Sequence, residues 1–312
     1  THEQAADLAE DQDEYTKTFY VPERGRWGNL KDLKHDIGAE LNKATEAIEE
    51  GNPVLEGVLV AIDFNNKNKL NDRKLRDLLS HYSTFRLRNE DFERPDLLGA
   101  AYEYLIKMFA DSAGKKGGEF FTPPQVVKLL VSLIKPHAGM KVLDPTCGSG
   151  GMLLQSRNYL ATHGENENNI QLFGQEMNLS TWAICKLNMF LHGFFNADIR
   201  KGDTLGEPQH VEHGELMRFD RVIANPPFSL KNWGRELAEH DGYGRYRYGI
   251  PPKDAGDLAF VQHMIASLNQ QGVMGVVVPH GVLFRGGQEG EIRKGILEDD
   301  LVEAVIGLPS GL

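Results

Sequence analysis

The sequence predicts an α/β fold in which helices cover both faces of a parallel sheet and a helical N-terminal domain comes first. Beyond residue 140, short apolar runs alternate with longer stretches of helix-forming residues, which is typical of parallel strands joined by crossover helices. Before residue 114, apolar residues between positions 98 and 109 recur at helical spacing. A Gly-Lys-Lys-Gly-Gly segment at 114–118 separates the two patterns as a linker would. We therefore expect a helical domain over residues 1–114 and the α/β domain over residues 115–312.

Length, composition and charge exclude several classes of protein. The 312 residues are 40% hydrophobic, enough for a sizeable core, so a disordered or fibrous chain is excluded. The formal net charge of −11 argues against a protein that coats nucleic acid through its overall field. No apolar run approaches the roughly 18 residues of a membrane helix. The only two cysteines form neither a disulfide framework nor a zinc site, so we expect a cytoplasmic protein without a metal.

The elements can be assigned in chain order. Helices are expected over 39–50 and 73–81, in a region where the first 50 residues hold 13 acidic and 6 basic side chains. Strands are expected over 141–144, 171–175, 220–224, 273–279 and 301–307, with a weaker one over 197–201. Helices between these strands are expected over 151–163, 179–192, 258–269 and 288–299.

Residues 229–256 fit neither pattern and predict a long loop. Five glycines and two prolines lie there among Trp233, three tyrosines and five basic residues. Long loops in compact domains tend to be functional or mobile. One interpretation is a mobile loop that offers stacking faces and phosphate partners to DNA, and the other is a solvated loop without a ligand.

Thr122 marks the start of a further helix. Thr122 is expected to cap it, with Pro123 in the first turn and Gln125 at the capping-box position, ahead of apolar residues at helical spacing. Taken alone, this motif indicates a helix start and nothing more. Its place one helix before the next motif favours a role in function.

A glycine turn follows the first strand of the α/β domain. Residues 142–151, Val-Leu-Asp-Pro-Thr-Cys-Gly-Ser-Gly-Gly, run from a strand through a turn into a helix and bring bare backbone against a ligand. The glycine spacing is not that of a dinucleotide or triphosphate loop. Asp144 at the strand end is a poor neighbour for phosphate but suits a cationic amino acid, such as the methionine part of S-adenosylmethionine (AdoMet). Cys147 is expected to be a packing residue.

Two further strands end at acidic residues. Glu176 ends the second strand about 26 residues past the glycine turn, where a carboxylate can accept both ribose hydroxyls of a nucleoside. Asp203 closes the weaker strand and can accept a hydrogen bond from an adenine amino group. An ordinary Gly-Asp turn explains Asp203 equally well.

The most informative motif is Asn225-Pro226-Pro227-Phe228, directly after the strand 220–224. Two prolines continue neither sheet nor helix, so they fix the backbone. The Asn225 side-chain oxygen and the Pro226 carbonyl can accept both N–H bonds of an exocyclic amine and aim its lone pair at a methyl donor, without a strong base. Phe228 offers a face on which an extruded base can stack. A proline turn beside a core phenylalanine is the alternative interpretation.

Together these motifs resemble the modification (M) subunit of type I restriction-modification systems, an N6-adenine DNA methyltransferase family. The resemblance runs from about residue 96 to 312 and rests on five segments in order: 118–123, 144–151, 174–178, 225–228 and 279–285 (Pro-His-Gly-Val-Leu-Phe-Arg). It implies a Rossmann-like AdoMet-dependent methyltransferase sheet and N6-adenine methylation of DNA. It also implies a helical N-terminal domain for DNA clamping and assembly, a specificity subunit that reads the target, and a restriction subunit in the full complex.

The resemblance implies roles for individual residues. Binding of AdoMet falls to Glu119, Phe120, Phe121, Thr122, Pro123, Pro124, Asp144, Ser149, Gly150, Gly151, Glu176 and Asp203. Catalysis falls to Asn225, Pro226, Pro227 and Phe228. Because the chain begins with Thr1 and ends just after the strand expected at 301–307, we expect it to lack parts of the family's N-terminal domain and of its C-terminal end.

Other functions stay open at this point. Similar tetrapeptides serve in the methylation of guanine in RNA and of glutamine in protein. The N4 amine of cytosine is chemically close to the N6 amine of adenine. A non-catalytic assembly subunit would keep the same fold.

Overall fold

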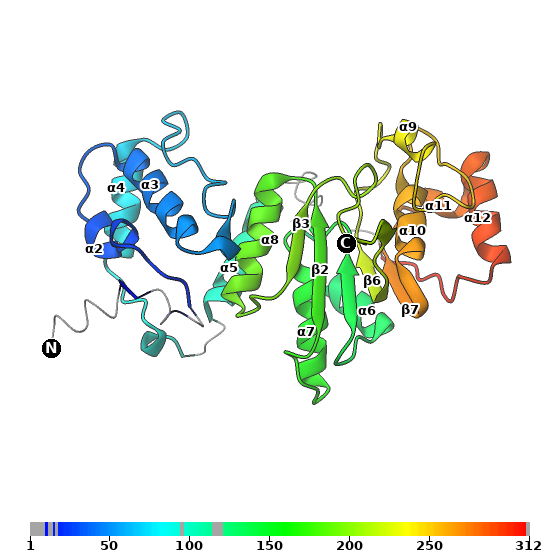
Figure 1. Cartoon of the computed structure of the whole chain (residues 1–312), viewed down its shortest axis with the longest axis horizontal. Coiled ribbons are helices and arrows are strands. Elements are labelled where there is room, and N and C mark those ends of the chain that lie inside the picture. The colour runs from blue at the N-terminus through cyan, green and yellow to red at the C-terminus, as the bar shows by residue number, and fades with distance from the viewer. Residues whose placement is uncertain (1–9, 12–14, 16–17, 94–96, 114–120, 310–312) are drawn as a thin grey trace. The chain divides into compact units, whose positions relative to one another are not determined.

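The structure is a computed structural model that describes residues 10–11, 15, 18–93, 97–113 and 121–309. It divides into two compact units, Thr1–Leu97 and Leu98–Leu312 (Figure 1). The linker expected at 114–118 lies outside the described residues, so the domain boundary after residue 114 stays a prediction. None of the described helices is long and apolar enough to cross a membrane.

The first unit is helical, as predicted. Its core joins helices α3 and α4 through the buried side chains of Ile37, Leu75 and Leu79. Asn71 caps α4 by accepting the N–H of Lys74 at 3.0 Å. The elements of this unit are η2 (Glu23–Gly25), α2 (Trp27–Leu30), α3 (Ile37–Glu50), η3 (Pro53–Leu55), α4 (Asp72–Tyr82) and η4 (Asn89–Asp91).

The second unit alternates helices and strands. Helix α5 (Leu97–Ala113) begins at the boundary between the units. The strands are β1 (Lys141–Asp144), β2 (Gln171–Glu176), β3 (Asp198–Lys201), β4 (Val211–Glu212), β5 (Glu215–Leu216), β6 (Phe219–Ala224) and β7 (Leu268–Val276). The helices that follow α5 are α6 (Pro124–Ile134), α7 (Gly151–Thr162), α8 (Leu179–Leu191), α9 (Arg235–Ala238), α10 (Asp257–Ala266), α11 (Gly281–Phe284) and α12 (Gln288–Glu298).

The central sheet has the order β3-β2-β1-β6-β7, and all its pairings are parallel. After β1 the chain moves outward through β2 to β3, then returns to the other side of β1 at β6. Strand order therefore reverses between β1 and β6. At such a point the crossover connections diverge and leave a crevice at the carboxyl ends of the strands, where ligands bind.

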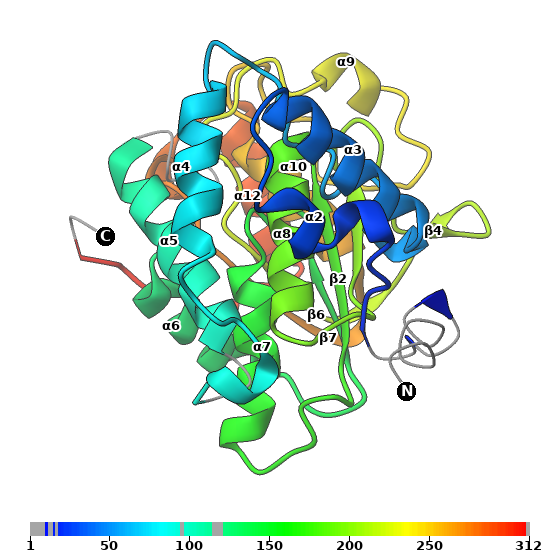
Figure 2. The same cartoon turned by 90° about the vertical axis from the view of Figure 1, so that its left-hand side faces the viewer.

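Helices cover both faces of the sheet, as the alternation of side chains along β7 demonstrates. At Gly275 an added Cβ would contact Leu130 and Ile134 of α6, so this position faces α6. The neighbouring Met274 and Val276 instead pack against the clusters that contain α10 and α12. Helices α6 and α7 lie side by side (Figures 1 and 2). The predicted α/β architecture is therefore confirmed.

The structure corrects one predicted strand. Residues 301–307, expected as a strand, form none within the described part of the chain, and Val305 is exposed. A strand exists only where a neighbour completes its hydrogen-bonded ladder, and β7, at the edge of the described sheet, pairs with β6 alone.

Sequence reasoning also missed a small antiparallel hairpin, β4–β5. Val211 pairs with Leu216, and the two turn residues His213 and Gly214 both have positive φ, at 53° and 83°. A two-residue hairpin turn requires this backbone geometry. The neighbouring His213-Gly214 pair was the available signal.

Candidate active site

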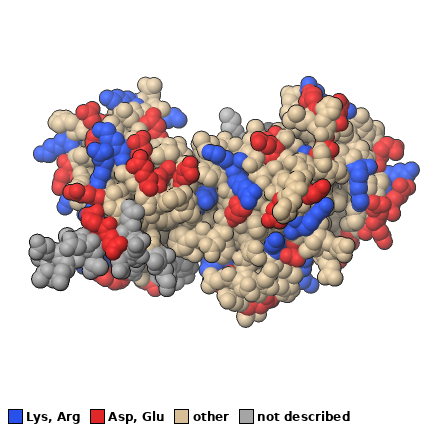
Figure 3. Space-filling view, viewed as in Figure 1, with Lys and Arg blue, Asp and Glu red and all other residues tan. Residues whose placement is uncertain are grey.

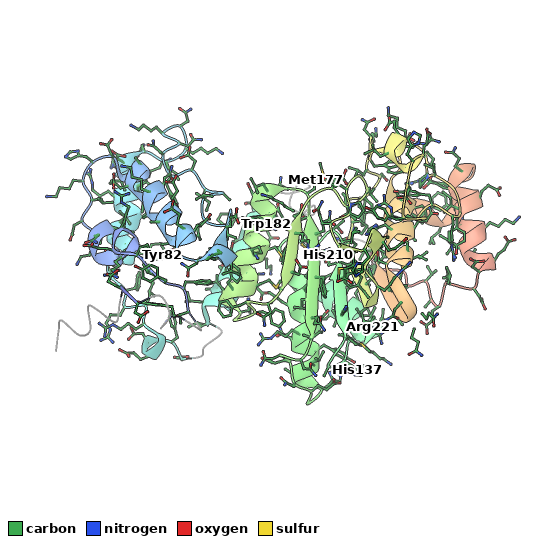
Figure 4. The ribbon with its side chains drawn as sticks, in the orientation of Figure 1. Tyr82, His137, Met177, Trp182, His210 and Arg221 are labelled. Carbon is green, nitrogen blue, oxygen red and sulfur yellow. The ribbon has the colours of Figure 1, made fainter. Side chains whose placement is uncertain are left out.

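The carboxyl edge of the sheet holds most of the predicted site residues. Asp144 ends β1, and Asn225 directly follows β6, the strand paired with β1 through Leu143 and Val222. Figure 4 marks this edge by Met177, which follows β2, and the opposite edge by His137, which precedes β1. The reversal of strand order thus brings Asp144 and Asn225 to one crevice although 81 positions separate them in the sequence.

The glycine turn between β1 and α7 contacts strand β2 and helix α8. Gly148 and Gly150 have φ values of 53° and 83°, in the left-handed region that favours glycine. The N–H of Cys147 donates to the Gln175 carbonyl of β2 at 3.0 Å. An added Cβ at Gly150 would collide with Met189 of α8 and lie 2.8 Å from the Cys185 sulfur. Close packing on α8 therefore requires glycine at position 150.

A cavity of about 370 Å³ opens beside this turn. Its volume lies within the range of small-molecule and cofactor sites, roughly 300 to 1,000 Å³. Elements far apart in sequence contribute to its wall: the start of α6, the end of β1, the glycine turn, α8 and the residue after β6. The predicted residues that line it are Phe121, Thr122, Pro124, Asp144, Ser149, Gly151 and Asn225.

Helix α5 supplies wall residues that sequence reasoning missed. Glu103, Tyr104 and Lys107 line the cavity, as do Lys128 of α6 and Asn188 of α8. The helical spacing in α5 indicates packing alone. Periodicity identifies the apolar face of a helix but does not show which cavity the polar residues beside it line, so the sequence contains no signal for these residues.

Asp144 lies in an environment that favours its neutral form. Its side chain is 2% exposed, and burial raises its pKa to about 8, with the nearby Glu176 adding to the rise. The N–H of Thr146 donates to Asp144 Oδ1 at 3.0 Å and partly opposes the shift. A carboxyl group whose pKa is raised in this way has no cation beside it that stabilises its charged form. The site therefore fits a ligand with a positively charged amino group.

Glu176 and Asp203 lie at the strand ends where they were expected, but outside the lining of the cavity among the described residues. Glu176 Oε2 accepts the N–H of Gly148 at 3.1 Å, and Oε1 accepts the N–H of Asn178 at 2.8 Å. Burial raises the Glu176 pKa against these bonds. Asp203 Oδ1 accepts the N–H of Leu205 at 3.0 Å. In this state Glu176 supports the glycine turn, and Asp203 supports its own loop.

Thr122 contacts Asn225 rather than capping a helix. The cap residue of α6 is Pro123, without a side-chain cap hydrogen bond in the described structure, so the predicted capping by Thr122 and Gln125 is wrong. Thr122 Oγ1 instead accepts a hydrogen bond from Asn225 Nδ2 at 3.1 Å. In the structure the Asn225 nitrogen therefore faces Thr122. The Asn225 oxygen is left without a hydrogen-bond partner among the described residues.

Two more buried acceptors in the cavity wall share this property. Thr146 Oγ1 and Asn188 Oδ1 have no hydrogen-bond partner within the described residues, and the Asn188 amide nitrogen donates to the Ser149 carbonyl at 2.9 Å. Buried polar atoms are normally paired, and leaving one unpaired costs about 1 to 3 kcal/mol. The acceptors of Thr146 and Asn188, together with Asp144, fit a ligand that carries N–H donors, as AdoMet does.

The remaining residues of the tetrapeptide lie beside the cavity. Pro226 is buried, whereas the Phe228 side chain is 52% exposed. Pro123, Gly150, Pro226, Pro227 and Phe228 are not wall residues of the cavity, and Glu119 and Phe120 lie outside the described residues. The exposed ring of Phe228 is thus free to stack on a partner from solution.

The loop 229–256 is packed more closely than the sequence suggested. Trp233 is 3% exposed, and its indole N–H donates to the Pro252 carbonyl at 2.8 Å. Arg245 is also buried, paired with Asp241 at 2.8 Å and bonded to the carbonyls of Thr204 and Leu205. The expectation that these two side chains offer DNA a stacking face and a phosphate partner is therefore wrong, because both are used within the fold.

Over the ranges that the structure describes, no group of three or more His, Cys, Asp or Glu side chains could hold a metal ion. Cys147 and Cys185 are both buried free thiols, and Cys147 also lines the cavity. The packing role expected for Cys147 agrees with its burial but stays a prediction.

The fold and the site define an AdoMet-dependent methyltransferase. A parallel sheet flanked by helices carries a glycine turn and a cavity with an acidic, N–H-accepting wall at its switch point. Residues 93–312 match the family described as N-6 DNA Methylase, and residues 1–81 match the HsdM N-terminal domain. The chain belongs to the N-6 DNA methylase family, among the methylase subunits of type I restriction enzymes, and AdoMet is the cofactor that this family uses.

Individual relatives agree with this assignment. The type I restriction enzyme HindI methylase subunit of Haemophilus influenzae is 33% identical, over 94% of this chain and 69% of its own length. The MpnII methylase subunit of Mycoplasma pneumoniae is 36% identical, over 91% and 55%. The crystal structure of a type I methyltransferase subunit from Streptococcus thermophilus superposes with a TM-score of 0.78 at 29% identity, over 94% and 65%. The chain therefore spans between about half and two thirds of these relatives.

Proposed function

We propose that the complete protein transfers the methyl group of AdoMet to the N6 amine of an adenine extruded from DNA. The observation that carries this proposal is the fixed amide of Asn225, whose nitrogen is bonded to Thr122 and whose oxygen has no partner among the described residues. An adenine amine needs an acceptor of this kind, because its lone pair is delocalised into the ring and must be redirected toward the methyl group.

The cavity is the proposed AdoMet site. Asp144 and the acceptors of Thr146 and Asn188 would hold the amino acid part, next to the backbone of the glycine turn at Ser149–Gly151. Glu119–Pro124 would cover the carboxylate side, Glu176 the ribose and Asp203 the adenine. The Glu176 carboxyl group, which accepts the N–H groups of Gly148 and Asn178, would accept the ribose hydroxyls with its remaining lone pairs. When bound, the cofactor supplies an activated methyl group on a positively charged sulfur.

The chemical step at the base follows from the tetrapeptide. Asn225 Oδ1 and the Pro226 carbonyl accept the two N–H bonds of the adenine amine, while Pro227 keeps the backbone rigid and Phe228 stacks on the ring. The nitrogen lone pair would then face the methyl group that the bound cofactor supplies. On transfer the cofactor sulfur would keep the electron pair of its bond to the methyl group, and the amine would release one proton to solvent. The Asn225 and Pro226 oxygens stabilise charge that develops only in the transition state.

DNA affinity is proposed to come largely from a partner. The relatives are named as subunits, so the protein functions within a multisubunit system. We infer a cytoplasmic complex in which a specificity subunit reads the target sequence and a restriction subunit joins the full assembly. On the face drawn in Figure 3, basic and acidic side chains are interspersed rather than gathered into one basic field. With a net charge of −11, the chain by itself offers little electrostatic attraction to phosphates.

The domain organisation belongs to the same proposal. We infer a helical domain over residues 1–114 in front of a methyltransferase domain over 115–312. The compact units of the structure divide between Leu97 and Leu98, so α5, which contributes Glu103 and Lys107 to the cavity, belongs to the second unit. Methylation of RNA guanine, protein glutamine or cytosine N4, or a purely structural subunit, are the alternatives that an assay of the product separates.

The test is methyl transfer from tritium-labelled AdoMet by the full-length protein assembled with its specificity subunit. Label is expected in N6-methyladenine of cognate DNA and absent from RNA and protein. Asn225→Ala removes one preorganised acceptor and is expected to lower the single-turnover rate about a hundredfold to a thousandfold, with AdoMet affinity nearly unchanged. Asn168→Ala, in an exposed loop before β2, is the control. A wild-type rate in Asn225→Ala, or label in another product, would contradict the proposal.

A further inference from the structure

The segment that follows the tetrapeptide makes an unusual turn. Ser229 comes directly after Phe228 and has a φ of 50°, in the left-handed region that residues with a side chain avoid. Such a conformation persists only where surrounding groups hold it. The direction in which Phe228 projects depends on this turn, because the two residues share a peptide bond.

A buried carboxylate holds the turn from the backbone side. Asp257, the first residue of α10, is 2% exposed, and its Oδ1 accepts the N–H of Ser229 at 2.7 Å. Its other oxygen, Oδ2, accepts a hydrogen bond from Arg285 Nη1 at 3.1 Å. Asp257 therefore links the end of the tetrapeptide to the segment 279–285, for which the proposed reaction supplies no role.

Arg285 bonds to the side chain of Ser229. Its Nη2 donates to Ser229 Oγ at 3.3 Å, and its Nη1 also donates to the buried Glu289 at 3.1 Å. An added Cβ at Gly281 would collide with the Arg285 guanidinium, so glycine at 281 makes room for the arginine. The spacing Gly281 to Arg285 in the motif thus has a geometric reason.

We propose that Asp257 and Arg285 are positioning residues that clamp Ser229 and thereby hold Phe228 in place for the target base. The inference rests on the proposed function, since Phe228 is there assigned to stack on the extruded adenine. A network of buried charges is weak evidence for stability, because well-packed apolar residues often serve as well or better. Here the charged groups do what apolar residues cannot. They accept a hydrogen bond from the backbone N–H of Ser229 and donate one to its side-chain hydroxyl, and so hold both groups in defined positions.

The kinetic experiment uses the full-length protein in its assembled complex. Arg285→Met and the isosteric Asp257→Asn are expected to lower the single-turnover methylation rate about tenfold, the effect of one or two lost hydrogen bonds, and to change AdoMet affinity less than twofold. Lys294→Met, which removes an exposed cation of α12, is the matched control and is expected to behave as wild type. Wild-type rates in both variants, or a parallel loss of AdoMet binding, would overturn the clamp.

A double-mutant cycle separates positioning from general support. If the clamp acts through Phe228, Arg285→Met added to Phe228→Ala lowers the rate no further than Phe228→Ala alone. Full additivity of the two losses contradicts the proposal. Arg285→Lys, which keeps the charge but not the fork of donors, is expected to restore only part of the rate.

Amide hydrogen exchange on the free protein tests the clamp without DNA or AdoMet, and therefore independently of the proposed reaction. In the free protein, Arg285→Met is expected to speed amide hydrogen exchange at 228–230, the residues after the two prolines, while leaving the glycine turn at 146–151 unchanged. Equal exchange at 228–230 in variant and wild type contradicts the clamp whatever the reaction is. Lack of methylation by the wild-type complex, with the exchange change present, contradicts the proposed function alone.

Discussion

At the scale of single residues, the site depends on polar atoms whose partners are set by neighbours distant in sequence. Thr122 and Asn225 are 103 positions apart, yet they share a hydrogen bond in which the Asn225 nitrogen faces Thr122. Asp144 is equally dependent on its surroundings, because burial, with a smaller contribution from Glu176, raises the pKa of its carboxyl group to about 8. A variant at Thr122 and a variant at Asp144 each test what these surroundings contribute.

Thr122→Val keeps the shape of the side chain but removes the oxygen that accepts the Asn225 N–H. The amide of Asn225 then loses its orientation, and the single-turnover rate at saturating AdoMet is expected to fall roughly five- to tenfold, the equivalent of about 1 kcal/mol. Thr122→Ser keeps the hydroxyl group and is expected to have the wild-type single-turnover rate. If Thr122→Val weakens AdoMet binding while the saturated rate is unchanged, Thr122 serves the cofactor alone.

Asp144→Asn tests the raised pKa of this carboxyl group. Because Asp144 binds its proton more tightly in the folded protein, folding takes up a proton between about pH 4 and 8, and the free energy of unfolding falls as pH rises through this window, by up to about 1.4 kcal/mol per pH unit. The variant is therefore expected to melt higher than wild type, by a margin that is larger at pH 8 than at pH 5, and to bind AdoMet more weakly.

The control for this comparison is Asp111→Asn, an exposed position on α5. Differential scanning calorimetry at the two pH values measures the margin, and titration calorimetry measures AdoMet binding. A melting difference that is the same at both pH values would show that Asp144 is already ionised at pH 5.

At the scale of elements, the glycine turn connects the packing of helix α8 to the wall of the cavity. The same backbone that forms the cavity wall at Ser149 and Gly151 packs on α8 through Gly150. Asn188 of α8 also bonds to the Ser149 carbonyl. The turn is therefore positioned by α8, and a change in its packing is expected to reach the cofactor.

Gly150→Ala and Gly164→Ala form a matched pair that separates two effects. Both glycines have similar positive φ values, 83° and 75°, so alanine meets a similar backbone strain of about 1 kcal/mol at each. Only at Gly150 does the added methyl group collide with Met189 and approach Cys185, whereas at Gly164 it meets open space. Gly150→Ala is expected to lose additional stability and most AdoMet affinity. Equal melting temperatures for the two variants would show that Met189 and Cys185 move aside without loss of stability.

At the scale of the whole molecule, the described residues that line the cavity all belong to the second unit. Each residue that lines it lies between positions 100 and 225, within Leu98–Leu312. The first unit has its own core around Ile37, Leu75 and Leu79. The proposed division of labour assigns cofactor chemistry to the second unit and clamping or assembly to the first.

Hydrogen exchange on the full-length protein tests this division. Added AdoMet is expected to slow amide exchange at 121–128 and 144–152, which border the cavity, and to leave helices α3 and α4 unchanged. A bound ligand stabilises the elements it contacts, while independent units respond separately. Equal slowing in α3 and α4 would mean that the two units respond as one.

Much of this molecule follows from the sequence alone, because its signals are local. The alternation of strands and helices, the glycine turn after β1 and the rigid tetrapeptide after β6 each depend on residues a few positions apart, and parallel topology then requires the strand ends to share one edge. These local signals are therefore sufficient to predict that Asp144 and Asn225 meet at one crevice.

Tertiary structure alone decided the features that depend on partners distant in the chain. Thr122 bonds to Asn225 instead of capping α6, and α5 contributes to the cavity wall. Tertiary structure also buried Trp233 and Arg245 within the loop 229–256, and left residues 301–307 without a strand to pair with among the described residues. A hydrogen bond, a cavity wall and a β-ladder each need two participants, and periodicity along one segment specifies only one of them.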